Sequence, residues 1–243
     1  MTNGALAVKD ELENVLSIYQ QSKNDKNVDN KPNLILGSTT HGVYIEGGRV
    51  IQAGEGNTFV EISSSDHKSD DIGDHLIQIH NLIHLWNRAG LNVRGLNKEQ
   101  MFALQWKKLA TNCAINPLTA LLQCYNGELL NKNTITLTNT PNITHDTQDI
   151  MNDIIKEVSE VAILSSPYDK NEDLTYDALT KFVHDVIKRT ARNKSSMLQD
   201  ILHNRQPTEI QYLNGFVSRV GQDQFNLPMT LNTSICSEVE SLY

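Results

Sequence analysis

One stretch, residues 106–130 (WKKLATNCAINPLTALLQCYNGELL), constrains the fold of this 243-residue chain more than any other. Its apolar residues recur at the spacing of one helix face, which predicts a helix packed against a core. They are Leu109, Ala110, Cys113, Leu118, Leu121 and Leu122. On another flank, Lys108, Asn112 and Asn116 follow one another at i, i+4 and i+8. The predicted helix therefore carries a cation and two amides on one side.

The pair Asn116-Pro117 predicts a kink or a new helix start, because proline lacks a backbone N–H and disfavours helical geometry in the residue before it. Two interpretations of the polar flank remain open. It is either a solvated face, as is usual for a lysine on an amphipathic helix, or a surface that grips an oxygen-rich small molecule beside the break.

Composition excludes several classes of protein. The net charge is −8 and no basic run dominates, so we do not expect a nucleic-acid partner. Mean hydropathy is −0.39 and no apolar run has spanning length, which argues against a membrane protein. The first residues lack an apolar signal core, and the three cysteines form no C-x-x-C pair. We therefore expect a reducing, cytoplasmic location.

The first part of the chain mixes strand and helix patterns. Helices are expected over residues 10–19 and 73–88, and strands over 33–37, 43–45, 50–52, 58–62 and 91–93. Residues 46–49 (Glu-Gly-Gly-Arg) predict the turn of a hairpin.

Helix patterns dominate after about residue 97. They cover residues 98–116, 118–124, 146–164, 175–189, 195–202, 208–220 and 234–242, whereas 131–144 reads as a loop. The chain is thus expected to hold an α/β segment over residues 1–96, followed by an all-α domain over 97–243.

Two further polar clusters occur in the helical part, at residues 193–200 (NKSSMLQD) and 207–215 (PTEIQYLNG). Ser or Asn before an apolar run, with a polar or acidic residue a turn later, is typical of a helix N-terminus, so the serines and Asn193 of the first cluster are capping candidates, and Thr208 could cap in the second. Glu209 would then lie in a first turn, where negative charge is favoured. A helix N-terminus also binds carboxylates and phosphates, and the two interpretations are compatible.

No metal site is expected. His80 and His84 are four residues apart, but no acidic third ligand follows closely. The sequence also lacks a P-loop, a G-x-S-x-G elbow and a G-x-G-x-x-G fingerprint. Gly54-Glu55-Gly56 begins like the last of these but has no third glycine.

The order and spacing of KLATNCAINPLTALLQCYNGEL, NKSSMLQDI and TEIQYLNGFV resemble the helical C-terminal domain of ketopantoate reductase (2-dehydropantoate 2-reductase). Upstream, TNGALAVKDEL and LILGSTTHGV resemble the later part of that family's Rossmann-type domain. The resemblance implies a partial Rossmann-type segment and a helical domain like the C-terminal domain of 6-phosphogluconate dehydrogenase. It also implies NADP(H)-dependent reduction of ketopantoate to pantoate, on the way to pantothenate and coenzyme A, and it leaves the oligomeric state open.

The resemblance assigns roles residue by residue. Lys108 matches the catalytic lysine, which would protonate the carbonyl oxygen as negative charge builds there. Asn112 and Asn116 match amides that hold the substrate. Asn126 lies in the matching N-G-E-L segment and is assigned to the same substrate-binding group.

Four further positions complete the implied site. Asn193 and Ser196 match substrate contacts near its carboxylate and hydroxyls. Glu209 matches an acid that helps to place the substrate and the cofactor ribose. Asn3 matches an Asn that lines the cofactor cleft.

The chain departs from the family pattern at its beginning. The family's first strand, glycine-rich phosphate loop and following helix have no counterpart in these 243 residues, so we expect this chain alone to bind NADPH poorly. Two hypotheses follow. The chain is either a ketopantoate reductase in truncated form, or a non-enzymatic helical interaction module whose polar clusters are caps and whose partial sheet is completed by another chain.

Overall fold

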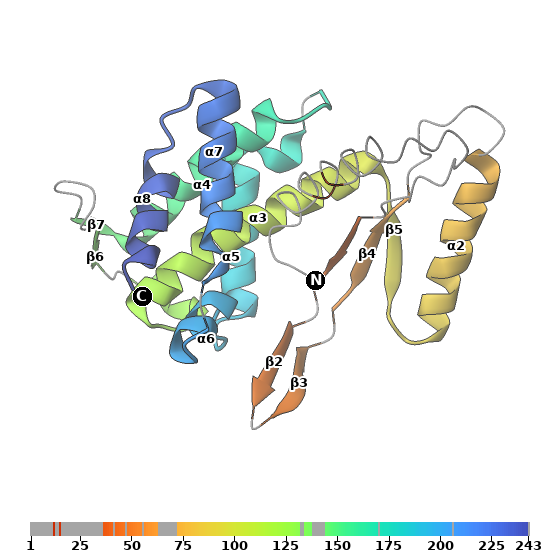
Figure 1. The fold of residues 1–243 in the computed structure, drawn as a ribbon, viewed down its shortest axis with the longest axis horizontal. Coiled ribbons are helices and arrows are strands. Elements are labelled where there is room, and N and C mark those ends of the chain that lie inside the picture. The colour runs from red at the N-terminus through yellow and green to blue at the C-terminus, as the bar shows by residue number, and fades with distance from the viewer. Residues whose placement is uncertain are drawn as a thin grey trace. The chain divides into compact units, whose positions relative to one another are not determined.

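The computed structural model describes Leu12, Val15 and residues 36–40, 42–46, 48–54, 56–62, 72–131, 134–137, 144–169, 171–205 and 207–242. From residue 36 onward these form two compact units, and the division falls between Leu104 and Gln105 (Figure 1). Leu12 and Val15 are helical, whereas the rest of the helix expected over residues 10–19 lies outside the described residues.

The first unit contains a three-stranded sheet in the order β1 (Gly37–Thr39), β4 (Thr58–Glu61), β5 (Val93–Leu96). β4 and β5 run parallel, and α2 (Ile72–Arg88) connects them, which makes a β-α-β unit. β1 pairs antiparallel with β4. Val60, Ile79 and Val93 are buried in this unit. A parallel pair joined by a helix is the element expected of a Rossmann-type segment.

A separate hairpin in the first unit consists of β2 (Gly42–Glu46) and β3 (Arg49–Gly54). Glu46 pairs with Arg49 across the turn, and Gly48 takes a positive φ of 76°. Glycine suits this position because it adopts left-handed backbone geometry without steric cost. The hairpin expected around residues 46–49 is confirmed.

The second unit is built around α3 (Lys98–Leu122), the long helix labelled in Figure 1, whose residues from Gln105 onward belong to this unit. The new helix start expected after Asn116 is wrong, because α3 continues through Pro117. Proline removes the donor that the carbonyl four residues earlier, that of Cys113, would use. The buried Asn214 side chain supplies a replacement, with Nδ2 donating to the Cys113 carbonyl over 3.1 Å. A side chain distant in sequence thus gives the Cys113 carbonyl the hydrogen bond that the helix backbone does not supply at Pro117.

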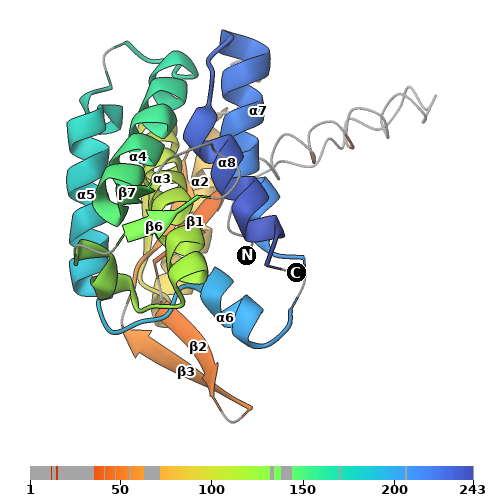
Figure 2. The same cartoon turned by 90° about the vertical axis from the view of Figure 1, so that its left-hand side faces the viewer.

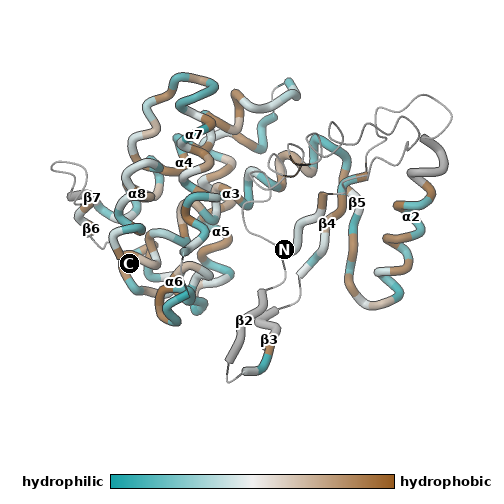
Figure 3. Tube along the Cα trace, viewed as in Figure 1, coloured by the Kyte–Doolittle hydropathy of each residue, from teal (hydrophilic) through white to brown (hydrophobic). Residues whose placement is uncertain are grey.

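The other helices of this unit pack together, as Figure 2 shows for α4, α5, α7 and α8. They are α4 (Thr147–Leu164), α5 (Tyr176–Arg189), α6 (Ser196–Leu202), α7 (Asn214–Phe225) and α8 (Thr230–Glu240). Hydrophobic and hydrophilic residues alternate along their traces (Figure 3). Most of the large, fully buried side chains of the core are aliphatic. They include Leu118, Ile150, Ile154, Ile155, Leu179 and Ile187.

Short 3₁₀ helices and a hairpin connect these helices: η1 (Asn126–Leu130), η2 (Glu172–Leu174), η3 (Glu209–Tyr212), and β6 (Thr134–Thr136) paired with β7 (Thr144–Asp146). The loop expected over residues 131–144 is therefore partly wrong, and the single helix expected over 208–220 divides into η3 and α7. Among the described helices, none combines the length and the apolar character that a membrane crossing needs.

Candidate functional site

Three elements of the second unit bring predicted site residues together. Asn116 comes from α3, Ser196 is the first residue of α6, and Glu209 is the first residue of η3. Asn116 Nδ2 donates to Ser196 Oγ over 3.2 Å and to Glu209 Oε1 over 3.1 Å. Ser196 Oγ donates to the same Glu209 oxygen over 3.0 Å. An amide, a hydroxyl and a carboxylate from distant parts of the sequence thus form one hydrogen-bonded triangle.

Lys108 lies on the same flank of α3 as Asn116 and is partly buried. Burial lowers the pKa of the Lys108 ammonium from its ordinary value of 10.5, because loss of water disfavours the charged form. The Glu209 carboxylate opposes this effect and raises the pKa, although less strongly. The ammonium therefore senses the charge of the carboxylate that Asn116 and Ser196 hold.

Asn112 lies between Lys108 and Asn116 along the flank. Its Nδ2 atom is buried, and among the described residues it has no hydrogen-bond acceptor. A buried amide donor without a partner loses its hydration at a cost of roughly 1–3 kcal/mol. An acceptor oxygen of a bound molecule would remove that cost, so this atom fits an oxygen-rich ligand.

The start of α6 explains why Ser196, rather than Ser195, reaches Glu209. Ser195 Oγ accepts from the Leu198 backbone N–H over 3.1 Å, which is an N-cap, and lies 2.7 Å from Thr119 Oγ1 of α3. The capping interpretation is thus confirmed for Ser195. The cap and Thr119 fix the first turn of α6 against α3, and Ser196 is left to contact Asn116 and Glu209.

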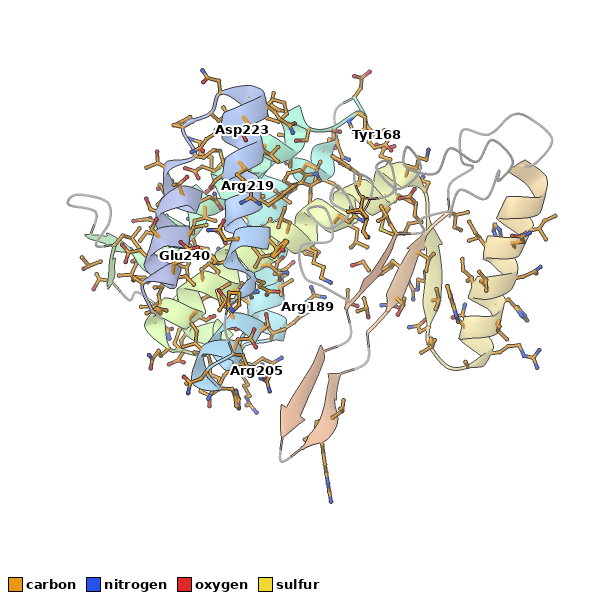
Figure 4. The ribbon with its side chains drawn as sticks, viewed as in Figure 1. Tyr168, Arg189, Arg205, Arg219, Asp223 and Glu240 are labelled. Carbon is orange, nitrogen blue, oxygen red and sulfur yellow. The ribbon has the colours of Figure 1, made fainter. Side chains whose placement is uncertain are left out.

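Side-chain hydrogen bonds to α7 and α8, rather than an N-cap, hold η3 in place. The cap expected from Thr208 is wrong, since η3 has no side-chain cap hydrogen bond. Instead Gln211 accepts from Arg219 of α7 over 3.2 Å and donates from Nε2 to Glu240 of α8 over 2.7 Å. Figure 4 labels Arg219 and Glu240 on those two helices. These bonds fasten the short helix that carries Glu209.

Asn126 and Asn193 belong to a second junction. Asn126 donates from Nδ2 to Thr190 Oγ1 over 2.9 Å, and its backbone N–H donates to the Asn193 carbonyl over 3.0 Å. The next residue, Gly127, donates to the Ala191 carbonyl, and a Cβ atom at Gly127 would approach the Ala191 Cβ to 2.7 Å. Asn126 is buried in this contact, while Asn193 is exposed. The contacts seen for Asn126 join η1 to the turn after α5 rather than to the Asn116 triangle.

Asn3 lies outside the described residues, so its predicted role stays a prediction. Sequence reasoning also missed Thr119 and Asn214, which connect α3 to α6 and α7. A signal for Asn214 existed, since Pro117 leaves one carbonyl of α3 without a helix donor and some other group must supply it.

Solved structures share the fold of this chain, with a sheet-containing part and a helical part. One solved relative in fold is the ternary structure of D-mandelate dehydrogenase with NADH and anilino(oxo)acetate, with a TM-score of 0.62 and 19% identity over 86% of this chain and 59% of that one. At that identity the likeness shows the fold alone.

The family follows from sequence. The family model described as ketopantoate reductase PanE/ApbA C terminal matches residues 100–242, and the chain belongs to this family. A 2-dehydropantoate 2-reductase of Vibrio cholerae is 38% identical over 137 residues, which are 56% of this chain and 40% of the relative. The enzyme of the same name from Shigella flexneri is 35% identical over 187 residues, 76% of this chain and 51% of the relative. The chain thus spans about half the length of the curated relatives it matches.

Proposed function

We propose that this chain carries the substrate-binding and proton-donating part of an NADP(H)-dependent 2-dehydropantoate 2-reductase, which reduces ketopantoate to pantoate. The observation that carries the proposal is the meeting of Asn116, Ser196 and Glu209, with the Lys108 ammonium in the electrostatic range of Glu209. The names of the curated relatives give the reaction and the substrate.

Reduction of a ketone to an alcohol requires a proton donor close to the carbonyl oxygen. Reduction of the 2-keto carbon builds negative charge on the carbonyl oxygen, and a nearby ammonium stabilises that charge and then gives a proton to the oxygen. Lys108 supplies this ammonium. Because burial lowers its pKa, it releases a proton more readily than an exposed lysine does.

Neutral donors and one carboxylate suit the rest of the substrate. Ketopantoate carries a carboxylate, a ketone and a hydroxyl. The unpaired Nδ2 donor of Asn112 and the exposed amide of Asn193 are free to donate to oxygen atoms of the first two groups. Glu209 accepts hydrogen bonds from Asn116 and Ser196 and so is suited to accept one from the hydroxyl. Fixing these groups would orient the keto carbon before reduction.

The residues that the structure describes do not fit the pyrophosphate of NADP(H). A dinucleotide site needs a glycine-rich turn between a strand and a helix, whose N-terminus receives the phosphates. The Gly54-Glu55-Gly56 stretch is instead at the end of a strand and before another strand: Gly54 is the last residue of β3, and Gly56 lies between β3 and β4. A bound nicotinamide would supply the hydride, and we assign to the described residues of this chain the substrate side of the reaction.

The non-enzymatic alternative is less well supported by the contacts. It expects the polar clusters to be helix caps; Ser195 makes that bond in the first cluster, and η3 has no side-chain cap in the second. Ser196 and Asn116 instead contact a carboxylate, which a capping role does not require.

Calorimetric titration of the chain with ketopantoate tests the proposal. The matched control ligand is 3,3-dimethyl-2-oxobutanoate, which has the same keto acid and lacks the hydroxyl. We expect saturable binding of ketopantoate and binding of the control that is about tenfold weaker, the equivalent of one lost hydrogen bond. Equal affinity for the two ligands would remove the hydroxyl contact, and no binding of either would reject the proposal.

A further inference from the structure

A series of hydrogen-bonded polar groups runs from the partly buried Glu157 of α4, through the buried Asn232 and Asn214, to α3. Glu157 accepts hydrogen bonds from the backbone N–H groups of Leu231 and Asn232 over 2.8 and 2.9 Å, at the start of α8. Asn232 Nδ2 also donates to Glu157 over 2.8 Å. Asn214 Nδ2 then donates to Asn232 Oδ1 over 2.9 Å and to the Cys113 carbonyl over 3.1 Å. Asn214 and Asn232 are fully buried.

The Glu157 carboxylate at one end and the Cys113 carbonyl at the other determine which group donates in each of these hydrogen bonds. A carboxylate only accepts, so Asn232 must turn its NH₂ group toward Glu157 and its oxygen toward Asn214. Asn214 must in turn present its NH₂ group to that oxygen. The same NH₂ group then has a second hydrogen for the Cys113 carbonyl, the acceptor that Pro117 leaves without its helix donor. Pro117 therefore removes a donor from the Cys113 carbonyl, and Asn214, far away in the sequence, supplies one.

The two ends of the Asn214–Cys113 bond are both next to the candidate site. The Cys113 carbonyl belongs to the helical turn that leads to Asn116. Asn214 is the first residue of α7 and is separated from the last residue of η3, Tyr212, by Leu213 alone. Leu213 is itself fully buried, so the connection has little freedom to move. The bond therefore connects the turn that carries Asn116 to the segment that carries Glu209.

We infer that Asn214 is a positioning residue of the site, which by donating to the carbonyl that Pro117 exposes holds η3, and with it Glu209, against Asn116. It does not contact Asn116, Ser196 or Glu209 by any hydrogen bond seen in the described residues, and acts through the backbone of α3 and η3. The inference rests on the proposed function, since it concerns how the ketopantoate-binding groups are kept in register.

The test compares Asn214→Ala with the double variant Pro117→Ala/Asn214→Ala. Alanine at position 117 restores a backbone N–H that can donate to the Cys113 carbonyl, so it should replace the lost bond. The control is Ser159→Ala, which removes another buried hydrogen bond of the unit, from Ser159 Oγ to the Leu174 carbonyl over 2.8 Å. All variants are titrated with ketopantoate at a temperature at which each is fully folded.

We expect Asn214→Ala to weaken ketopantoate binding about tenfold or more, the double variant to recover most of that loss, and Ser159→Ala to bind like the unchanged chain. The side-chain NH₂ signals of Asn116 in a ¹⁵N–¹H spectrum should move in Asn214→Ala and stay in place in Ser159→Ala. If Asn214→Ala alone does not fold, a folded, ketopantoate-binding double variant is the predicted rescue, and an unfolded double variant overturns the inference.

Two outcomes separate this inference from the proposed function. If Asn214→Ala binds ketopantoate as tightly as the unchanged chain while Ser196→Ala binds weakly, Asn214 has no positioning role and the proposed function stands. If the unchanged chain does not bind ketopantoate, the proposed function and the inference both fail.

Discussion

Ser196 Oγ donates a 3.0 Å hydrogen bond to Glu209 Oε1, which joins the first residue of α6 to the first residue of η3. Asn116 of α3 donates to both groups, so the pair is anchored to the longest of the described helices. The adjacent residue, Ser195, makes a different bond, to the backbone of its own helix. Two consecutive serines therefore make different contacts, Ser196 with the Glu209 carboxylate and Ser195 with the backbone of its own helix.

Replacing each of the two serines by alanine should separate the effect on ketopantoate affinity from the effect on the free energy of unfolding. Ser195→Ala removes an N-cap, so we expect it to lower the free energy of unfolding by about 1 kcal/mol. Ser196→Ala removes a hydrogen bond to a carboxylate, so we expect ketopantoate affinity to fall about tenfold, with a smaller effect on unfolding. Urea unfolding and calorimetric titration of both variants measure the two quantities. The opposite pattern, with affinity lost in Ser195→Ala alone, would place Ser196 outside the site.

The lowered pKa of Lys108 predicts that ketopantoate binding depends on pH. A keto acid is an anion, so its affinity should fall as pH rises through the folded-state pKa of Lys108, at a midpoint below 10.5. Lys108→Arg keeps the charge at all of these pH values, so its affinity should not show this fall. Titrations from about pH 7 to about pH 11.5 span the ordinary pKa of lysine and measure both profiles. A midpoint at or above 10.5 would mean that burial does not control this group.

The same pKa shift predicts the sign of a stability change. The pKa of Lys108 is lower in the folded chain than in the unfolded chain, so between the two values the unfolded chain binds more protons. Stability from this group therefore rises with pH across that window and is smallest below the folded pKa. Compared with Lys108→Met, the unchanged chain should gain stability as pH increases toward 10.5. A loss over that range, measured by denaturant unfolding, would contradict the assigned burial effect.

Cofactor affinity should be low in this chain by itself. The described elements include no strand-to-helix glycine turn that could receive a pyrophosphate, so we expect no saturable binding of NADPH up to about 1 mM. Calorimetric titration measures this directly, with ketopantoate in a parallel titration as the positive control. Tight NADPH binding by these 243 residues would refute the prediction.

The sequence predicted the local structure well where one face of an element is buried. α4 and α5 begin and end within a residue or two of their predicted bounds, because their apolar residues mark the face that packs on the core. The β2–β3 hairpin was likewise predictable from its glycine-rich turn.

The prediction failed where a tertiary contact replaces a local rule. Pro117 does not end α3, because Asn214, distant in sequence, takes over the role of the missing donor. In the site, the helical spacing placed Lys108, Asn112 and Asn116 on one flank, but their relation to Ser196 and Glu209 came from family resemblance. Periodicity does not say which helix faces which, so the Asn116 triangle needed the structure.

The most direct test of the central claim compares two adjacent lysines. Lys107 forms an ion pair with Asp173 over 2.8 Å and lies over the Phe182 ring, whereas Lys108 is the ammonium influenced by Glu209. Each is changed to alanine in the chain joined to an upstream segment that carries the family's glycine-rich loop, and ketopantoate-dependent NADPH oxidation is measured.

Loss of a general acid typically costs 10²–10⁴ in rate, so we expect kcat to fall at least about 100-fold in Lys108→Ala. Lys107→Ala should retain kcat within about twofold, since Lys107 pairs with the exposed Asp173 and not with a residue of the candidate site, and such a pair contributes little. Equal kcat values in the two variants would contradict the assignment of Lys108 as the proton donor.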